Sequence, residues 1–266
     1  MFKTIKYGSG YGQREFDLEP YKSWQEREIL LASSLNEDEF LISGIDKIFE
    51  YLKTNIIFKN DYKLTKNEKI YILYMLRSIS VSESINSKNI CPECKKPFDL
   101  ELPIENFVKM PENFQNSFEL NDYTLYYKDS FEDNEIENYF FKIKNNINSI
   151  ETSNEKDIEN FINELNIEEE IILKSFVEQN KTKFEFASIK KCPYCKSEFK
   201  IPMDSDSFVI SILSEDSLIS LYKTISNMIF HSNYSKTDID NMIPFERGIF
   251  VSLLDANLKE LREVKK

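Results

Sequence analysis

The two stretches Cys91-Pro92-Glu93-Cys94 and Cys192-Pro193-Tyr194-Cys195 decide how this chain folds, because they contain all four of its cysteines. Each stretch is followed by a lysine and, four positions after its second cysteine, by a phenylalanine (Phe98 or Phe199), so the chain contains a short internal repeat. Two thiolates three positions apart can reach one ion when the backbone turns tightly, and four thiolates form the closed ligand set of a structural Zn²⁺. We expect one structural zinc ion per chain, bound by Cys91, Cys94, Cys192 and Cys195.

The gap between the two stretches sets a condition on the fold. Residues 95–191 separate them, which is far more than the spacing in compact zinc motifs. Tertiary folding around an insertion must therefore bring the two turns together. Four protein ligands leave no open position for water, so such a zinc ion would hold structure and would not catalyse a reaction.

Two other interpretations of the cysteines remain open. Cys192-Pro193-Tyr194-Cys195 has the redox frame of glutaredoxin-like proteins, in which the first cysteine follows a buried strand and begins a helix. Here the stretch lies between two strand-like segments, 183–186 and 198–201, and a redox role would leave the other cysteine pair without a function. Unliganded thiols are the second alternative. The repetition favours zinc over both.

Composition allows a sizeable core and restricts the chemistry. The chain has 266 residues, of which 41% are hydrophobic, which suffices for one or two domains. It has only 5 glycines and lacks the glycine-rich motifs that bind phosphate groups. Its single histidine, His231, lies in a helical stretch without a nucleophile motif, where a surface or interface role is favoured. We predict no catalytic residue, no enzymatic activity and no small-molecule substrate.

The net charge of −12 opposes a general role in nucleic-acid binding, which requires a concentrated basic surface. Four lysines do surround the second cysteine stretch, and we interpret them first as its solvated rim: Lys190, Lys191, Lys196 and Lys200. A nucleic-acid-associated regulatory factor with a zinc ribbon is therefore the alternative function. Most of the excess negative charge falls in residues 132–180, whose acidic faces either are solvated or contact a partner.

The start of the chain resembles no export signal, and no apolar run approaches membrane-spanning length. We therefore expect no membrane partner. Paired cysteines without an export signal fit a reducing cytoplasm, where metal binding is favoured over disulfides.

Hydrophobic periodicity predicts an α+β protein that is mainly α, with helical N- and C-terminal segments around the zinc ribbon. Residues 7–20 read as an extended arm. Helices are expected after capping boxes at Ser23–Glu26 and Thr65–Glu68, over about 42–53, and in the C-terminal part from 218 to 250, where Pro244 begins the last helix. Strands are expected over 98–102, 183–189 and 198–202, and a hairpin over 116–127 with Asn121-Asp122 at its turn.

Apolar stripes predict three helices within the acidic span 132–180, over residues 136–147, 158–165 and 171–176. The expected organisation has three regions. Residues 1–90 form an N-terminal arm and helical region, residues 91–205 form the zinc ribbon with the hairpin and the acidic helical insertion (132–180), and residues 206–266 form a C-terminal helical region.

Three stretches resemble the baseplate hub assembly proteins of T-even-type, contractile-tailed bacteriophages. The first is the predicted helix over 64–78 and the Ser80-Val81-Ser82-Glu83 that follows it, just before the first cysteine pair. The second is the hairpin around Tyr123-Thr124-Leu125-Tyr126-Tyr127. The third is the ending Asp238-Ile239-Asp240-Asn241-Met242-Ile243-Pro244-Phe245-Glu246-Arg247. Together they cover most of the chain from about residue 23 onward.

The resemblance implies a non-enzymatic protein that helps to build the baseplate hub of a phage tail. Its partners would be other tail and hub proteins. It would act in the host cytoplasm during assembly, or remain in the tail baseplate of the virion. The family offers no catalytic residue to transfer, and the zinc prediction depends on the cysteine spacing alone.

Overall fold

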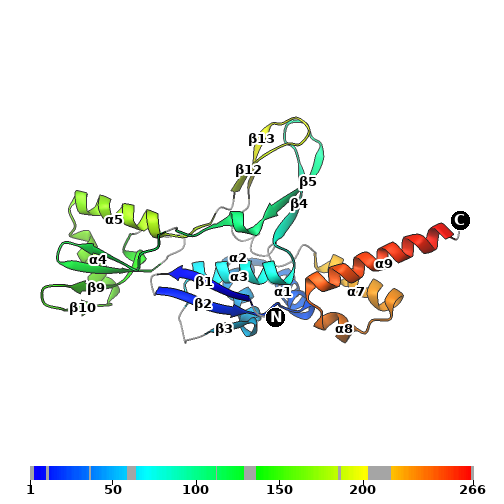
Figure 1. Cartoon of the computed structure of the whole chain (residues 1–266), viewed down its shortest axis with the longest axis horizontal. Helices are drawn as coiled ribbons and strands as arrows, with labels where there is room; N and C mark the ends of the chain where they lie inside the picture. The colour runs from blue at the N-terminus through cyan, green and yellow to red at the C-terminus, as the bar shows by residue number, and fades with distance from the viewer. Residues whose placement is uncertain are drawn as a thin grey trace.

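The computed structural model describes residues 3–9, 12–35, 37–58, 64–111, 113–128, 136–184, 187–202 and 217–264. Within these ranges a central body carries an insertion at one end and a group of C-terminal helices at the other, and two β-hairpins project from its middle (Figure 1). Helices combine with small antiparallel sheets, which confirms the prediction of a mixed α+β chain.

The central body packs one antiparallel sheet against three helices. Its strands pair in the order β1 (Lys3–Ser9), β2 (Gly12–Leu18) and β3 (Ile56–Phe58). The helices are α1 (Ser23–Leu35), α2 (Glu37–Leu52), which the short 3-10 helix η1 (Lys53–Asn55) follows, and α3 (Lys66–Ser80). Tyr7, Phe16 and Leu18 are fully buried in the main core. The predicted extended arm is therefore a hairpin that supplies part of this core.

Helix α3 begins as predicted, whereas α1 does not. The Thr65 hydroxyl accepts from the Glu68 N–H, and the Glu68 carboxylate accepts from the Thr65 N–H at 2.8 Å, which completes the predicted capping box. The capping box predicted at Ser23 and Glu26 is wrong. The side chain of Gln25 instead accepts from the Lys22 N–H at 2.9 Å, and Ser23 and Glu26 contact the C-terminal helices.

The insertion has a sheet and a core of its own. Its antiparallel strands lie in the order β10 (Glu151–Thr152), β9 (Phe140–Asn145), β8 (Tyr123–Tyr127) and β7 (Ser117–Leu120). Helices α4 (Glu155–Asn163) and α5 (Ile167–Asn180) pack on it. The β7–β8 hairpin turns at Asn121-Asp122 as predicted, with Asn121 in the left-handed region at φ 52°, where asparagine is better tolerated than most residues.

The helix predicted over residues 136–147 is wrong. A short 3-10 helix, η3 (Ile136–Tyr139), leads directly into strand β9. Tyr126 pairs with Lys142 and Tyr127 with Phe140, so Phe141 is an extra residue in the ladder, a β-bulge. A bulge lets residues three positions apart face the same side of a sheet. Phe140 and Ile143 are both buried in this way and imitate helical spacing. The insertion is therefore part sheet and only part helix.

A two-stranded stem closes the insertion at its base. Strand β6 (Val108–Lys109), which follows the 3-10 helix η2 (Ile104–Phe107), pairs antiparallel with β11 (Lys183–Phe184). Next to the stem, the buried Tyr7 and Thr182 hydroxyls lie 2.8 Å apart and link the insertion to the central sheet. The chain therefore leaves the body and returns to it at one place.

Three helices form the C-terminal group: α7 (Leu218–Ser232), α8 (Lys236–Asn241) and α9 (Pro244–Val264). Pro244 begins α9, as predicted. The group packs on α1, whose Leu30 shares a core with Leu221, Ile225 and Met228 of α7, and the far end of α9 extends away from the body (Figure 1). Among the helices described, none has both the length and the apolar character needed to cross a bilayer.

Candidate metal centre

Two β-hairpins carry the four cysteines. Strand β4 (Ser84–Ile90) pairs with β5 (Pro97–Pro103), and β12 (Ala187–Lys191) pairs with β13 (Glu198–Pro202). The predicted strands over 98–102 and 198–202 are thus confirmed. The predicted strand over 183–189 is divided between β11 and β12, and its residues 185–186 lie outside the described residues. Both hairpins project together from the body (Figure 1).

The two cysteine turns have the same backbone geometry. In the first, the Cys91 N–H donates to the Lys96 carbonyl at 3.1 Å, and the Lys95 N–H donates to the Cys91 carbonyl at 3.0 Å. Lys95 has φ 57°, which is uncommon for a residue with a side chain and brings Cys91 and Cys94 to one side of the turn.

The second turn repeats these two hydrogen bonds and the positive φ. The Cys192 N–H donates to the Ser197 carbonyl at 2.9 Å, and the Lys196 N–H donates to the Cys192 carbonyl at 3.0 Å. Lys196 has φ 63°. The internal repeat seen in the sequence is therefore a structural repeat, with one Cys-Pro-x-Cys turn at the tip of each hairpin.

The structure brings all four predicted ligands together. Their Sγ atoms all lie within 4.8 Å of one another. Two of the sulfur–sulfur contacts cross between the hairpins: Cys91 to Cys195 at 3.6 Å and Cys94 to Cys192 at 3.7 Å. No other group of three or more metal-binding side chains is found in the described ranges. The cluster thus joins residues that lie about a hundred positions apart in the chain.

These distances fit a tetrahedral metal ion. With Zn–S bonds of about 2.3 Å, the sulfurs of a regular tetrahedron lie about 3.8 Å apart, close to the two contacts between the hairpins. Four soft thiolates are also the donor set that selects zinc over hard cations such as calcium or magnesium. The residues present therefore fit a structural zinc ion in both distance and chemistry.

Two aromatic side chains pack against the cysteine cluster. Phe98 and Phe199, the phenylalanines of the sequence repeat, meet edge to face with ring centroids 5.6 Å apart. They form a small apolar cluster with the buried sulfurs of Cys91 and Cys192. Cys94 is half-buried and Cys195 is exposed. Burial therefore protects one sulfur of each hairpin more than its partner.

Local hydrogen bonds favour ionisation at two of the sulfurs. The backbone N–H of Cys94, 3.5 Å from Cys91 Sγ, lowers the pKa of the Cys91 thiol to about 6. Hydrogen bonds from the side chain and backbone of Ser197 lower the pKa of Cys195. At Cys94 the backbone N–H of Lys96 favours the thiolate, but burial and the neighbouring sulfurs outweigh it and raise the pKa to about 11. Four thiolates repel one another, and a divalent cation at their centre removes that repulsion.

A second site lies where the C-terminal helices meet α1. The buried Arg247 donates to the Glu26 carboxylate at 2.5 Å and to the Ser23 hydroxyl at 2.9 Å. The Ser23 N–H and hydroxyl both donate to the Met242 carbonyl, at 2.8 and 3.0 Å. Arg27 of α1 also pairs with Asp240. Two motifs noted in the sequence, the supposed capping box and the Pro-Phe-Glu-Arg ending, thus meet in one buried network.

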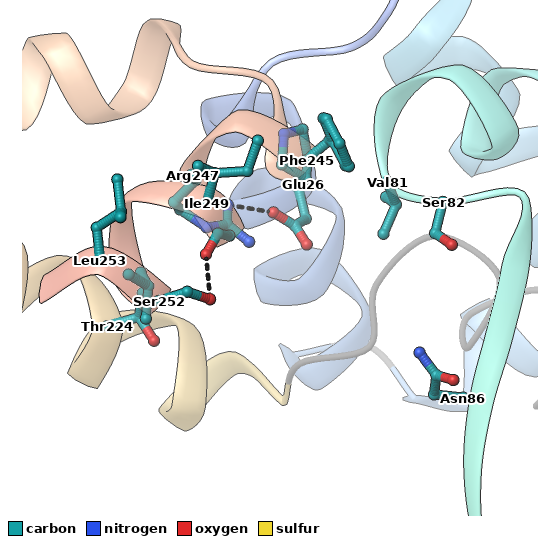
Figure 2. A pocket seen from close by; sticks show the side chains of 13 residues that line it. Glu26, Val81, Ser82, Asn86, Thr224, Phe245, Arg247, Ile249, Ser252 and Leu253 are labelled. Atoms are coloured by element: carbon teal, nitrogen blue, oxygen red, sulfur yellow. Dashed lines mark hydrogen bonds and ion pairs between the residues drawn. The ribbon is translucent and has the colours of Figure 1, made fainter. Parts of the chain in front are cut away.

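A pocket of about 630 Å³ opens beside this network (Figure 2). Phe245, Ile249 and Leu253 line it from α9 at helical spacing, and Val81 and Ser82 line it from the segment that follows α3. Among the described residues that line it, Glu26 carries the one carboxylate, and this carboxylate is paired with Arg247. The pocket is therefore suited to apolar contact more than to acid–base chemistry.

Comparison with protein families agrees with the resemblance seen in the sequence. The family described as T4 bacteriophage base plate protein matches residues 4–208, and the family described as Baseplate hub assembly protein Gp51 C-terminal domain matches residues 212–259. Neither the curated proteins nor the solved structures gave a match. Both families belong to one class, the proteins of a bacteriophage tail baseplate. The match to the first family covers more than half of the chain, so this chain belongs to the T4 bacteriophage base plate protein family. Its C-terminal helices match the C-terminal domain of a baseplate hub assembly protein.

Proposed function

We propose that this chain is a non-enzymatic structural or assembly protein of the baseplate hub, with one structural Zn²⁺ bound by Cys91, Cys94, Cys192 and Cys195. The convergence of the four sulfurs from two remote hairpins supports the zinc site most directly. The two family matches support the role in hub assembly. With four protein ligands, the ion would have no open position for a substrate.

The ion would act by closing a long loop. Two hairpins with little apolar core of their own would be joined at their tips, and the free energy of metal binding would add to folding. The proposed organisation keeps the zinc ribbon within residues 91–205, between the N-terminal region 1–90 and the C-terminal region 206–266, and the surfaces of these regions would be free for hub partners.

Metal analysis of the purified chain tests the zinc site. We expect about one zinc per wild-type chain, and loss of the metal when Cys94→Ser or Cys192→Ser removes a ligand. Pro193→Ala is the matched control for Cys192→Ser, because it changes the second cysteine turn without removing a sulfur. A wild-type chain that holds no metal and whose thiols all titrate normally would contradict the proposal.

Affinity capture from infected cells tests the assembly role. The tagged chain should recover tail and hub proteins from the host cytoplasm during assembly, and analysis of purified virions would show whether it stays in the baseplate. Recovery of transcription proteins without tail proteins would instead favour the alternative, a nucleic-acid-associated regulatory factor. That alternative also requires binding to DNA or RNA that weakens steeply as salt rises.

A thiol oxidoreductase fits the geometry less well. Cys192 lies between two strands of a hairpin, whereas the redox frame places it at the start of a helix. The oxidoreductase would have to exchange disulfides in its metal-free form, and a standard thiol–disulfide exchange assay measures this directly.

A further inference from the structure

Ser197 brings a hydroxyl group to the sulfur cluster at a point where the two hairpins meet. Its Oγ lies 3.0 Å from Cys195 Sγ, in its own hairpin, and 3.5 Å from Cys91 Sγ, in the other. The Ser197 carbonyl closes the second cysteine turn by accepting from the Cys192 N–H, and the Ser197 backbone also forms a hydrogen bond to Cys195. The hydroxyl group adds side-chain contacts with two sulfurs to these backbone contacts.

Comparison of the two repeated turns shows which contacts the Ser197 side chain contributes. Lys96 occupies the position of Ser197 in the first turn, and its carbonyl closes that turn in the same way. Its side chain does something different: the Lys96 Nζ lies 5.1 Å from the centre of the Tyr194 ring. Each of the two positions thus reaches across to the opposite hairpin, but only Ser197 does so by way of a sulfur.

We propose that Ser197 is a positioning residue of the metal site, a proposal that rests on the zinc site proposed above. A hydroxyl has one hydrogen to donate, and its charge-assisted bond would go to the nearer thiolate, Cys195. Cys195 is also the exposed sulfur of the four, so packing holds it least. The Ser197 hydroxyl fixes the orientation of the Cys195 side chain. Because the hydroxyl also contacts Cys91 Sγ, it sets the distance between Cys195 and the other hairpin.

Hydrogen bonds from outside the ligand set orient metal ligands, and their loss typically lowers metal affinity by about 10- to 100-fold. We expect Ser197→Ala in the full chain to weaken Zn²⁺ binding by a factor in this range, measured by competition with a chromophoric chelator. The sulfur-to-metal charge-transfer bands of the Co²⁺-substituted protein should shift as well, because the bond changes the electron density on one thiolate. Ser197→Thr keeps the hydroxyl and should restore both readouts.

Lys96→Ala is the matched control, since it removes the equivalent side chain without touching a sulfur, and it should leave affinity and spectrum unchanged. Far-UV circular dichroism checks that each variant is folded. Wild-type affinity and spectrum in Ser197→Ala would overturn the proposal, and so would equal losses in the Ala and Thr variants. A wild-type chain that binds no zinc would instead refute the metal site itself, which the same titration distinguishes.

Discussion

Arg247 and Glu26 show at the level of single residues how the two family-matched parts of the chain are joined. Both side chains are almost completely buried, at 5% and 2% exposure. A buried ion pair contributes little net stability over an apolar pair, but removal of one partner leaves an uncompensated charge in the interior. The contact between α1 and the C-terminal helices therefore depends on both residues being present.

Truncation of this pair should destabilise the contact strongly. Arg247→Ala removes the cation with which the buried Glu26 carboxylate forms an ion pair, and we expect a loss of about 3–5 kcal/mol. Urea unfolding followed by the fluorescence of Trp24, the single tryptophan, measures it, because Trp24 lies on α1 beside the network. Arg262→Ala, on the exposed part of the same helix, should change stability by less than about 0.5 kcal/mol. Equal stability of both variants would show that the pair does not hold the junction.

The sequence could predict that the four cysteines form one site, but it could not predict the ion pair between Arg247 and Glu26. The reason is physical. The four cysteines have few roles open to them, and the repetition of spacing and phenylalanine points to one site. The local sequence suggests that Ser23 and Glu26 form a capping box. In the structure Glu26 instead pairs with Arg247, which lies 221 positions further along the chain. The sequence does not single out Ser197, because a serine two positions after a cysteine has no spacing rule of its own.

At the level of elements, the insertion shows how far local patterns reach. The Asn121-Asp122 turn and helix α4 follow from local rules: a residue suited to positive φ, and an apolar stripe behind a good N-cap. Helix α5 also begins at a good N-cap, Asn166, but it buries Leu173, Phe176 and Val177, and Ile171 and Ile172 of the predicted stripe are exposed. Strand β9 does not follow from local rules, because the bulge at Phe141 arises from pairing with β8. A tertiary irregularity of this kind converts a strand pattern into a helical one, and sequence alone cannot separate the two.

A hydrogen bond links the Asn121-Asp122 turn to α5. It leads to a prediction about how stability depends on pH. The backbone of Asn166 and the side chain of Asn121 hold the pKa of Glu169 below its ordinary value, and the Asn121 amide donates to Glu169 at 2.5 Å. A carboxyl group whose pKa is lowered on folding stabilises the fold above its unfolded pKa, and this contribution is lost as the pH falls through the folded pKa.

Asn121→Gly keeps the positive φ of the turn and removes this donor. The Glu169 pKa should rise toward its ordinary value without reaching it, because the Asn166 backbone bond remains. NMR titration of the side-chain carboxyl groups measures the change. Asp238, whose pKa is lowered by Ser235 in the distant C-terminal helices, serves as an internal reference and should not move. An unchanged Glu169 pKa would show that the Asn121 contact is absent in solution.

Across the whole molecule, stability is divided among separate cores. The central body, the insertion and the C-terminal helices each bury their own apolar cluster, and the cysteines belong to a fourth, small one. Such units open independently when the contacts that join them are few. Loss of the proposed metal ion should therefore destabilise the two cysteine hairpins before the rest of the fold.

Chelation provides the test at this scale. Removal of zinc should increase amide hydrogen exchange over residues 84–103 and 187–202, while exchange in α3, α5 and α7 and the far-UV helical signal stay nearly unchanged. Addition of zinc should reverse the effect, and the Cys94→Ser variant should not respond to the chelator. Cooperative loss of all helices on chelation would show that the metal holds the entire fold, contrary to the separate cores.

The long interval between the two cysteine turns also has a consequence for synthesis on the ribosome. At translation rates of about 5–20 residues per second, the first hairpin emerges about 5 to 20 seconds before Cys195. Throughout that interval it offers two sulfurs of an incomplete site, while the β6–β11 stem and the insertion are still being made. The proposed zinc ion, which would need all four sulfurs, would bind only after the last of them leaves the ribosome, so metal binding would come late in the synthesis of the protein.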